Sequence, residues 1–270
     1  MGIVNVTPDS FSDGGRYFDT AAAIVHGRAL AAVGAAIVDV GGESTRPGAA
    51  PVDEAEELRR VVPVVHELAA DGRALVSIDT TKAAVAAAAI EAGARIVNDV
   101  SGGRRDPDIL RVVAGSDAAY VAMHMRGAPE TMRDEARYDN VVREVGDELL
   151  ARVDTAVAAG VDGGSILADP GIGFAKTGAQ SIALLRALPE IAARVGVPLL
   201  VGTSRKSFLA SMLDADADTE LARDDATLAT TVWCFQQGAA VVRVHDVAGS
   251  RRAAALLDVL ERATPDGVAA

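Results

Sequence analysis

Eight short apolar runs, each followed by an alanine-rich stretch with helical spacing, are the sequence feature that most constrains the fold. This alternation predicts parallel strands joined by crossover helices. The expected strands are Gly2–Thr7, Ile37–Gly41, Leu75–Thr80, Arg95–Val100, Ala119–His124, Ile166–Asp169, Pro198–Ser204 and Val241–Asp246. The expected helices are Thr20–Val33, Asp53–Ala70, Lys82–Ala92, Asp106–Ala114, Asn140–Ala159, Ser181–Val195, Asp225–Gln236 and Gly249–Ala263.

Eight such units predict an α/β fold of the (β/α)8 or TIM-barrel type, with residues 1–270 as one domain. An open doubly wound sheet is the alternative, but such sheets usually have fewer strands and bind dinucleotides through a G-x-G-x-x-G turn. The chain lacks that turn after every expected strand. Trp233 and Phe235 fall on the seventh expected helix, where an aromatic pair is expected in the core. Residues 264–270 are small and polar, and we expect them to fray.

The charge balance limits the partners that the chain can have. Lys and Arg number 26 against 38 Asp and Glu, which gives a net charge of -12. Such a chain repels nucleic acid and anionic membranes, so any anionic ligand must be captured locally. No apolar run approaches the roughly 18 residues of a membrane span. With Cys234 as the single cysteine and no leader-like segment, these features predict a soluble cytoplasmic protein with no nucleic-acid or membrane partner.

Polar residues interrupt the expected strands near their carboxyl ends, where a barrel of this kind builds its active site. They are Asn5, Asp39, Asp79, Asn98, Asp99, His124, Asp169, Arg243 and His245. A charge removed from water costs several kcal/mol unless it is paired. A chain built only for stability would therefore hold Val or Leu at these positions.

The direction of each polar side chain follows from the period of a strand. Adjacent strand residues point to opposite sides, so Asn98 and Asp99 cannot both face the lumen. We expect Asn98 to face inward, and Asp99 and Asp39 to be structural residues that accept hydrogen bonds from loop amides. Asp79 and Asp169 end buried-looking strands with no cation nearby in the sequence. We expect these two carboxylates to contact a ligand that is rich in hydrogen-bond donors.

Three glycine-containing loops, 7–15, 41–48 and 169–177, follow expected strands on the same face. Glycine lets the backbone approach a ligand or permits loop motion, although Gly, Pro and Ser also simply mark turns. The third loop resembles a P-loop only superficially, because Ala175 precedes Lys176 and the G-x-x-x-x-G-K-[ST] spacing is absent. A nucleoside triphosphatase is therefore rejected.

Cations gather after the last two expected strands. Arg205 and Lys206 precede a helix whose amino end is already positive, which favours an anionic or electron-rich ligand there. Arg243 and His245 are two residues apart and so share a face of strand eight. Strands seven and eight usually form the phosphate-binding corner of such a barrel. A phosphate or pyrophosphate ligand is expected, and the alternative is an ordinary salt-bridged arginine with a core histidine.

The motifs after nearly every expected strand resemble those of the dihydropteroate synthase family, the target of sulfonamides. The resemblance runs from Gly2 to about Arg252, and the motifs are GIVNVTPDSFSDGG, GGESTRPG, SIDT, NDVSGG, MHMRG, DPGIGFAK, SRKS and RVHD. Each piece alone would be weak, but eight in order are highly specific. One departure is that the chain opens directly on its first strand, whereas many relatives have a short segment that covers the barrel bottom.

The resemblance implies a transferase of folate biosynthesis. Such an enzyme condenses 6-hydroxymethyl-7,8-dihydropterin pyrophosphate with 4-aminobenzoate and yields 7,8-dihydropteroate and pyrophosphate. No protein nucleophile is needed, because the aromatic amine attacks the pterin methylene as pyrophosphate departs. Catalysis then consists of positioning and charge stabilisation. The resemblance also implies Mg²⁺ as cofactor and a homodimer formed through helices remote from the site.

The resemblance further implies a role for each matching residue. The expected pterin contacts are Thr45, Asp79, Asn98, Asp169, Lys206 and Arg243. The expected 4-aminobenzoate contacts are Phe11, Arg46, Pro47, Lys206 and Ser207. The expected pyrophosphate contacts are Asn5, Thr45, Arg243 and His245, with Asn5 also holding Mg²⁺. The expected catalytic residues are Asp13, Lys206, Arg243 and His245, where Asp13 stabilises cationic character on the pterin.

Two alternative functions remain for a chain of this pattern. A pterin-binding methyltransferase would transfer a one-carbon group to a corrinoid, but its methyl donor has no pyrophosphate for Lys206, Arg243 and His245 to bind. A non-catalytic paralogue would bind pterin without turning it over. The presence of Asn5, Asp13 and Arg46 argues against that alternative.

Overall fold

Parallel strands form the inner wall of the molecule in the computed structural model, which describes residues 1–6, 18–45, 49–128, 131–132, 134–210, 220–264 and 267–268. One continuous sheet contains β1 (Gly2–Asn5), β2 (Ile37–Gly41), β3 (Leu75–Asp79), β4 (Ile96–Asp99), β5 (Ala119–Met123) and β6 (Ile166–Asp169). Two short strands, β7 (Leu200–Val201) and β8 (Val241–Val242), pair with each other in parallel.

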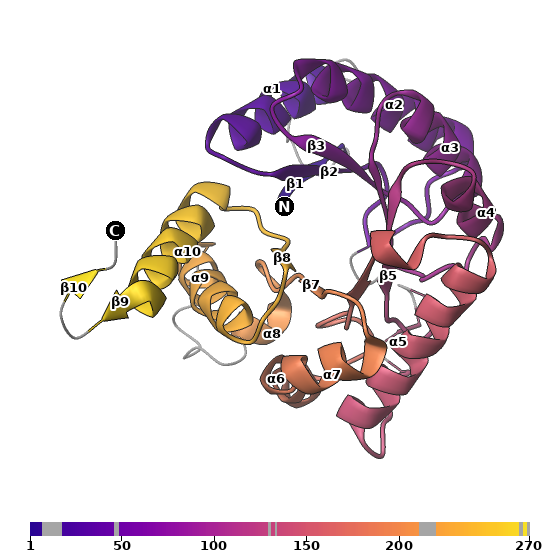
Figure 1. Ribbon diagram of the computed structural model, residues 1–270. Helices are drawn as coiled ribbons and strands as arrows, with labels where there is room; N and C mark the ends of the chain where they lie inside the picture. Colours follow the sequence, from indigo (N-terminus) through magenta and orange to yellow (C-terminus); the bar gives the residue numbers. More distant parts are fainter. Residues whose placement is uncertain are drawn as a thin grey trace.

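Two single-residue bridges close the cylinder between these two sheets. Ala168 bridges to Leu199 next to β7, and Gly2 bridges to Val244 just after β8. The eightfold barrel expected from the sequence is thereby confirmed (Figure 1). Strands β7 and β8 are shorter than expected. Beyond the ends of β7 and β8, the two segments are joined through a side chain and not by a backbone pair, because the backbone amide of His245 donates to Ser204 Oγ at 3.1 Å.

Helices surround the barrel on its outside (Figure 1). They are α1 (Phe18–Ala32), α2 (Glu54–Asp71), α3 (Ala83–Glu91), α4 (Asp108–Ala114), α5 (Val141–Ala158), α6 (Gly178–Arg186), α7 (Leu188–Val195), α8 (Ser207–Ala210), α9 (Glu220–Gln236) and α10 (Val247–Arg262). Side chains satisfy free amides at their starts, as where Asp53 accepts from Glu56 N at 2.8 Å and Asn140 accepts from Arg143 N at 3.0 Å.

One expected helix, Ser181–Val195, is wrong as a single element. The structure divides this region into α6 and α7, with Ala187 between them and Pro189 in the first turn of α7. Proline has no amide hydrogen, so it suits the first turn of a new helix and not the middle of a continuous one.

An apolar plug fills the lower part of the lumen, below the carboxyl ends of the strands. Its buried members are Ile96, Val121 and Leu200, and the partly buried residues packed on them include Met1, Ile37, Leu167 and Val241. A larger apolar layer lies between the strands and the helices and includes Val40, Ile78, Ala122 and Ala168. The polar residues of the strand ends therefore lie above a closed floor.

Two features at the outside of the barrel bear on the sequence expectations. Trp233 of α9 is not a core residue as expected, because its side chain is 41% exposed while its indole N–H donates to Leu185 O at 2.9 Å. Phe235 packs partly buried against the main core. After α10, β9 (Ala263–Thr264) and β10 (Gly267–Val268) form an antiparallel pair. The fraying expected for 264–270 stays a prediction.

Candidate active site

The strand register brings the polar strand ends together at one mouth of the barrel. Asp79 lies beside both Gly41 and Asn98 in the ladder, and Asp169 lies beside Met123. Asp79, Asn98 and Asp169 are 9%, 4% and 5% exposed, so each is nearly enclosed. The barrel thus concentrates carboxylate and amide groups above the apolar plug.

Arg243, which follows β8, connects the carboxylates of Asp39 and Asp79 by hydrogen bonds. Its Nε donates to Asp39 Oδ2 at 2.6 Å, and its Nη2 donates to Asp79 Oδ2 at 2.8 Å. Asn98 Nδ2 donates to the same Asp39 oxygen at 3.0 Å. The expectation that Asp39 binds loop amides is therefore wrong. Its partners are an arginine and an amide inside the lumen, because the alternation of β2 turns its side chain inward.

Asp99 behaves as the sequence predicts. Its carboxylate accepts from Ser101 N at 2.8 Å and from Gly103 N at 2.6 Å, and Tyr120 Oη donates to it at 2.9 Å. It therefore holds the loop after β4 from the outer side of the strand. Asn98, the preceding residue, faces the lumen, in agreement with the period of two.

Three acceptor oxygens at the mouth are left for a ligand. Gly171 N donates to Asp169 Oδ1 at 2.7 Å, which leaves Oδ2. Arg243 occupies Asp79 Oδ2, and Asn98 uses its amide nitrogen on Asp39. No described residue donates to Asp79 Oδ1, Asn98 Oδ1 or Asp169 Oδ2, and none of the three is a fully enclosed orphan atom. Together they suit a ligand edge that carries several N–H donors.

Burial shifts the ionisation of the carboxylates of Asp79 and Asp169. It raises the pKa of Asp79 to about 7, although the positive charge of Arg243 opposes the change. It also raises the pKa of Asp169, against the opposing effect of Lys206. A ligand that donates hydrogen bonds would favour the charged form of both groups.

Lys206 lies on the opposite side of the mouth. Its ammonium donates to Ile172 O and lies 4.7 Å from the centre of the Phe174 ring. Burial lowers the pKa of Lys206 to about 8, against the effect of the Asp169 charge. Lys206 can therefore donate to an acceptor on a ligand while the Phe174 ring covers one side of it.

Arg205 does not form a second ligand-facing cation, contrary to the expectation drawn from its position next to Lys206. Its backbone has a φ of 57°, which turns consecutive side chains apart. Its guanidinium binds Asp224 of α9 through Nε at 2.7 Å and Nη2 at 2.8 Å. Asp224 thus pairs with the positive charge of Arg205, for which no partner was evident in the sequence.

The remaining described residues of the expected site border the mouth. His245 Nδ1 contacts Ser204 Oγ at 2.8 Å, so the imidazole is held at the end of β8 near Arg243. Asn5 ends β1 and is partly buried, and Ser207 begins α8 and is exposed. Thr45 lines the neighbouring cavity. Phe11, Asp13, Arg46 and Pro47 lie outside the described residues.

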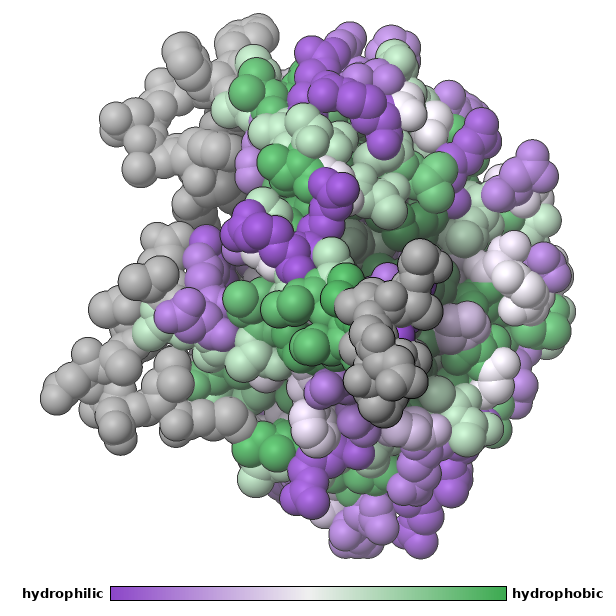
Figure 2. All heavy atoms as spheres, turned by 60° about the vertical axis from the view of Figure 1, so that its left-hand side comes forward, coloured by the Kyte–Doolittle hydropathy of each residue, from purple (hydrophilic) through white to green (hydrophobic). Residues whose placement is uncertain are grey.

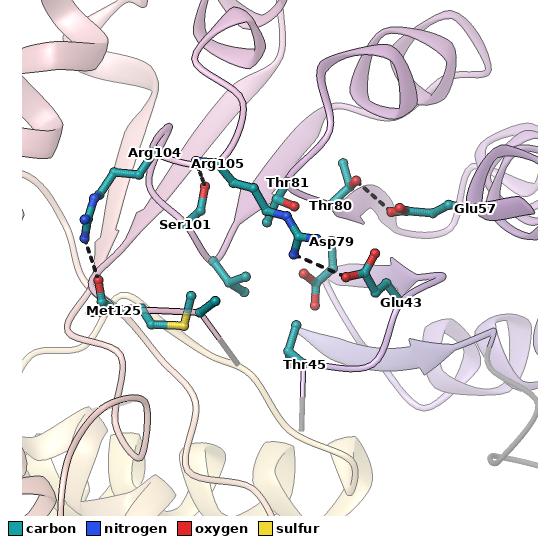
Figure 3. Close-up of a pocket in the computed structure, with 13 residues that line it drawn as sticks. Glu43, Thr45, Glu57, Asp79, Thr80, Thr81, Ser101, Arg104, Arg105 and Met125 are labelled. Carbon is teal, nitrogen blue, oxygen red and sulfur yellow. Dashed lines mark hydrogen bonds and ion pairs between the residues drawn. The ribbon is translucent and has the colours of Figure 1, made fainter. Parts of the chain in front are cut away.

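A cavity adjoins Asp79 and extends between the loops that follow β2, β3, β4 and β5 (Figure 3). Its lining residues are Glu43, Thr45, Glu57, Asp79, Thr80, Thr81, Val100, Ser101, Arg104, Arg105, Met125, Gly127 and Ala128. At this cavity Arg105 contacts Glu43 at 3.4 Å, and Arg104 donates to Met125 O at 3.3 Å (Figure 3).

Sequence reasoning missed the ion pairs behind this cavity. Lys82 binds both Glu43 of the β2–α2 loop and Glu57 of α2, and Thr80 donates to Glu57 at 2.7 Å. Burial lowers the pKa of Lys82, but its hydrogen bonds to the two carboxylates outweigh burial and raise it. A signal was present, because Glu57 falls on the same helical face as the apolar Val61, Val64 and Leu68.

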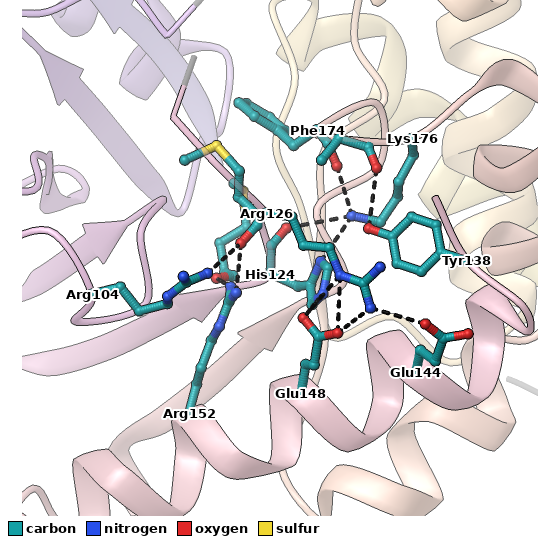
Figure 4. Close-up of polar contacts among 12 residues, drawn as sticks. Arg104, His124, Arg126, Tyr138, Glu144, Glu148, Arg152, Phe174 and Lys176 are labelled. Atoms are coloured by element: carbon teal, nitrogen blue, oxygen red, sulfur yellow. Dashed lines mark hydrogen bonds and ion pairs between the residues drawn. The ribbon is translucent and has the colours of Figure 1, made fainter. Parts of the chain in front are cut away.

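A second polar network lies behind β5 and does not face the cavity (Figure 4). His124 is fully buried, with Nε2 at 3.0 Å from Glu148 and Nδ1 at 3.0 Å from the Lys176 ammonium. Burial, aided by the charge of Lys176, lowers the pKa of His124 to about 3. The imidazole is therefore neutral and accepts from Lys176 while donating to Glu148.

This network fixes the loop after β6, which carries Phe174. Lys176 also donates to Phe174 O at 2.8 Å. Gly171 has a φ of 66°, and a Cβ there would lie 1.9 Å from His124 O, so no other residue fits this contact. The loop therefore packs directly on the end of β5. It thereby places the Phe174 ring beside Lys206 at the mouth.

Neither a metal cluster nor a membrane span is found in the described part of the chain. No three His, Cys, Asp or Glu side chains there meet in a way that could hold a metal ion. None of the helices described has both the length and the apolar character needed to cross a bilayer.

Comparison with known proteins identifies the protein family to which the chain is similar. Residues 1–245 match the family described as pterin binding enzyme. Dihydropteroate synthase of Mycobacterium leprae (strain TN) is 56% identical over 255 residues, which cover 93% of this chain and 89% of the relative.

Solved structures agree over nearly the whole length. Dihydropteroate synthase of Xanthomonas albilineans with 4-aminobenzoic acid has a TM-score of 0.90 and 42% identity, over 97% of this chain and 93% of that chain. The same organism's enzyme in complex with 7,8-dihydropteroate has a TM-score of 0.87 and 39% identity, over the same shares, 97% and 93%.

Proposed function

The chain belongs to the dihydropteroate synthases of the pterin-binding enzyme family, and from this premise we propose how its described residues perform the reaction. The enzyme is a transferase that joins 6-hydroxymethyl-7,8-dihydropterin pyrophosphate to 4-aminobenzoate, with 7,8-dihydropteroate and pyrophosphate as products. The observation that carries the proposal is the convergence of three available acceptor oxygens with Lys206 and Arg243 at one barrel mouth.

The pterin ring is placed by its hydrogen-bonding edges. Its guanidine-like edge carries N–H donors, which match Asp79 Oδ1, Asn98 Oδ1 and Asp169 Oδ2. Hydrogen bonds to the two carboxylates are charge-assisted and so stronger than neutral ones. Lys206 donates to the acceptor side of the ring. The result is a fixed orientation that points the reactive methylene out of the mouth.

The pyrophosphate and the second substrate occupy the outer part of the mouth. Arg243 and His245 would lie against the pyrophosphate, and Thr45 would add a hydroxyl contact from the β2–α2 loop. Lys206 and Ser207 would meet the carboxylate of 4-aminobenzoate. By family resemblance Phe11, Arg46 and Pro47 complete that pocket, and Asp13 stabilises positive charge on the pterin.

The chemistry is a direct substitution at carbon. The amine nitrogen of 4-aminobenzoate forms a bond to the pterin methylene while the bond from that carbon to the pyrophosphate oxygen breaks. The nitrogen then gives up a proton, and pyrophosphate leaves with the negative charge. Arg243 and His245 lower the barrier by stabilising that charge as it develops.

Magnesium fits the donor set that Asn5 provides. Mg²⁺ prefers oxygen ligands, keeps several waters and takes others from substrate phosphates, so one carboxamide oxygen at the end of β1 is a sufficient protein ligand. When bound there, the ion would supply positive charge to the pyrophosphate.

The proposal extends to the state of the protein in the cell. We expect residues 1–270 to form one domain that assembles as a homodimer in the cytoplasm. The exposed Ile182 of α6 and Trp233 of α9 support an interface on helices away from the mouth, since large exposed apolar groups favour burial against a partner. Cys234, the single cysteine of the chain, is buried and free, which suits a reducing compartment.

An initial-rate assay of pyrophosphate release tests the proposed function. Release is expected only when the pterin pyrophosphate, 4-aminobenzoate and Mg²⁺ are all present, with 7,8-dihydropteroate formed in equal amount. Omission of each component in turn is the control. Release without 4-aminobenzoate would indicate a hydrolase and contradict the proposal. Full activity in the presence of a chelator would remove only the Mg²⁺ assignment.

A further inference from the structure

Asp39 is a charged lumen residue for which the proposed reaction has no use. It is 0% exposed, and one of its oxygens accepts from both Arg243 Nε at 2.6 Å and Asn98 Nδ2 at 3.0 Å. Its other oxygen, Oδ1, is buried without a hydrogen-bond partner among the described residues. Burying a carboxylate is costly, so a residue of this kind needs a reason beyond stability.

The contact with Asn98 decides how that side chain is oriented. An amide has a donor end and an acceptor end, and a half-turn of the terminal group exchanges them. A carboxylate can only accept, so Asp39 retains the NH₂ end of Asn98 and repels the carbonyl end. Asn98 Oδ1 is thereby left for the ligand. No other described side chain holds the Asn98 amide.

We propose that Asp39 is a positioning residue that makes Asn98 present an acceptor to the ligand, and that it thereby selects the N–H edge of a pterin. This inference rests on the proposed function, which supplies the pterin. Asp39 does not touch the ring. It acts through Asn98, while Arg243 keeps a second anchor on Asp79 at 2.8 Å.

An isosteric substitution separates this role from that of the charge alone. In Asp39→Asn the amide oxygen takes the place of Oδ2, which accepts from both Arg243 Nε and Asn98 Nδ2, because arginine has no acceptor. Asn98 then keeps its orientation, and we expect the affinity for 6-hydroxymethylpterin, measured by calorimetry, to stay within about threefold of the wild-type value. Asp39→Leu removes the acceptor, so the Asn98 amide is free to turn its NH₂ toward the cavity, and we expect the affinity to fall about tenfold or more because a ligand N–H then meets a donor.

A double-mutant cycle shows whether Asp39 acts through Asn98. Asn98→Ala removes the acceptor that Asp39 orients, so Asp39→Leu has no amide left to release in that background. We expect Asp39→Leu to lower the pterin affinity of the Asn98→Ala variant by less than about twofold, although it lowers the affinity of the wild type about tenfold.

Ser77 offers a matched control in the same layer of the barrel. It is the ladder partner of Asp39 on β3, and its hydroxyl is buried without a partner in the described part of the chain. Ser77→Ala should leave pterin affinity within about twofold, since no hydrogen bond is lost. Thermal unfolding of every variant checks that each one is folded at the temperature of the binding experiment.

The results that would overturn the role of Asp39 differ from the result that would overturn the proposed function. Wild-type affinity in Asp39→Leu, or an equal loss from Asp39→Leu with and without the Asn98 amide, would overturn the role of Asp39. A wild-type protein that binds no pterin would instead overturn the proposed function. A loss in Asp39→Leu that Asp39→Asn avoids, and that the Asn98→Ala background does not show, is the result that the structure predicts.

Discussion

Asp79 and Asp169, the two carboxylates at the ends of β3 and β6, each have one oxygen engaged by the protein and one left over. Arg243 holds Asp79, and the Gly171 amide holds Asp169. Such contacts fix the rotamer before a ligand arrives, so less conformational entropy is lost on binding. The site is therefore preorganised by donors from elsewhere in the barrel and does not depend on the ligand to order it.

Two shifted ionisations at this mouth predict a bell-shaped pH dependence of pterin binding. Burial raises the pKa of Asp79 to about 7, so the carboxylate takes a proton and loses acceptor strength below that pH. Burial lowers the pKa of Lys206 to about 8, so the ammonium loses its proton above that pH. Affinity for 6-hydroxymethylpterin should be highest between these values, as calorimetry across pH 5 to 10 would measure.

Two substitutions test which group causes each limb of the pH profile. Asp79→Asn should weaken binding and remove the acid limb, while Lys206→Met should remove the alkaline limb. A profile whose acid limb persists in Asp79→Asn would show that another group titrates there.

The sequence predicted which residues face the lumen better than it predicted their partners. The period of two placed Asn98 inward and Asp99 outward correctly. The expected partners of Asp39 and Arg205 were wrong, because Arg243 follows β8, Asn98 ends β4 next to Asp99, and Asp224 lies on α9. Arg243 is 204 positions from Asp39 in the chain. A single sequence does not show which strand end meets which after the barrel closes.

At the scale of elements, the β2–α2 loop is anchored at its base by ion pairs. Glu43 in the loop and Glu57 on α2 share the ammonium of Lys82, and Glu57 is only 1% exposed. Arg60 of α2 adds a hydrogen bond to Gly42 O at 2.9 Å. Arg46 and Pro47, the expected 4-aminobenzoate contacts, follow three and four residues after Glu43, so we expect this anchor to influence the binding of that substrate.

Removing the shared cation should affect stability and one substrate more than the other. Lys82→Met leaves two carboxylates facing each other, one of them buried, and should lower the free energy of unfolding by about 3 kcal/mol. The KM for 4-aminobenzoate should rise several-fold more than the affinity for pterin falls. Denaturant unfolding and initial-rate kinetics measure the two effects.

The conservative variant is the control for this element. Lys82→Arg keeps a cation between the two carboxylates and should retain most of the stability and the wild-type KM. Equal losses for both substrates in Lys82→Met would contradict a role confined to the β2–α2 loop.

Element boundaries were predicted closely where local chemistry defines them. Asp53 and Asn140 are N-caps, and the helices after them begin one residue later than expected. The break before Pro189 was missed, because the apolar period continues across it. Strands β7 and β8 were predicted too long, since polar residues there leave the ladder to form the site.

At the scale of the whole molecule, the barrel itself was predictable because eight similar units repeat along the chain. Its closure depends on two bridges that no local pattern encodes. Figure 2 shows hydrophilic side chains spread around the periphery of one face, with apolar ones grouped near its centre. Helix α10 contributes exposed Leu256 and Leu260 to the outer surface.

We propose that three acceptor oxygens, from β3, β4 and β6, bind one edge of a pterin opposite Lys206. A crystal structure of the protein with 6-hydroxymethylpterin tests this claim most directly. We expect the pterin N–H nitrogens to lie within hydrogen-bond distance of Asp79 Oδ1, Asn98 Oδ1 and Asp169 Oδ2. A ring bound elsewhere, for example in the neighbouring cavity against Arg104 and Met125, would contradict it.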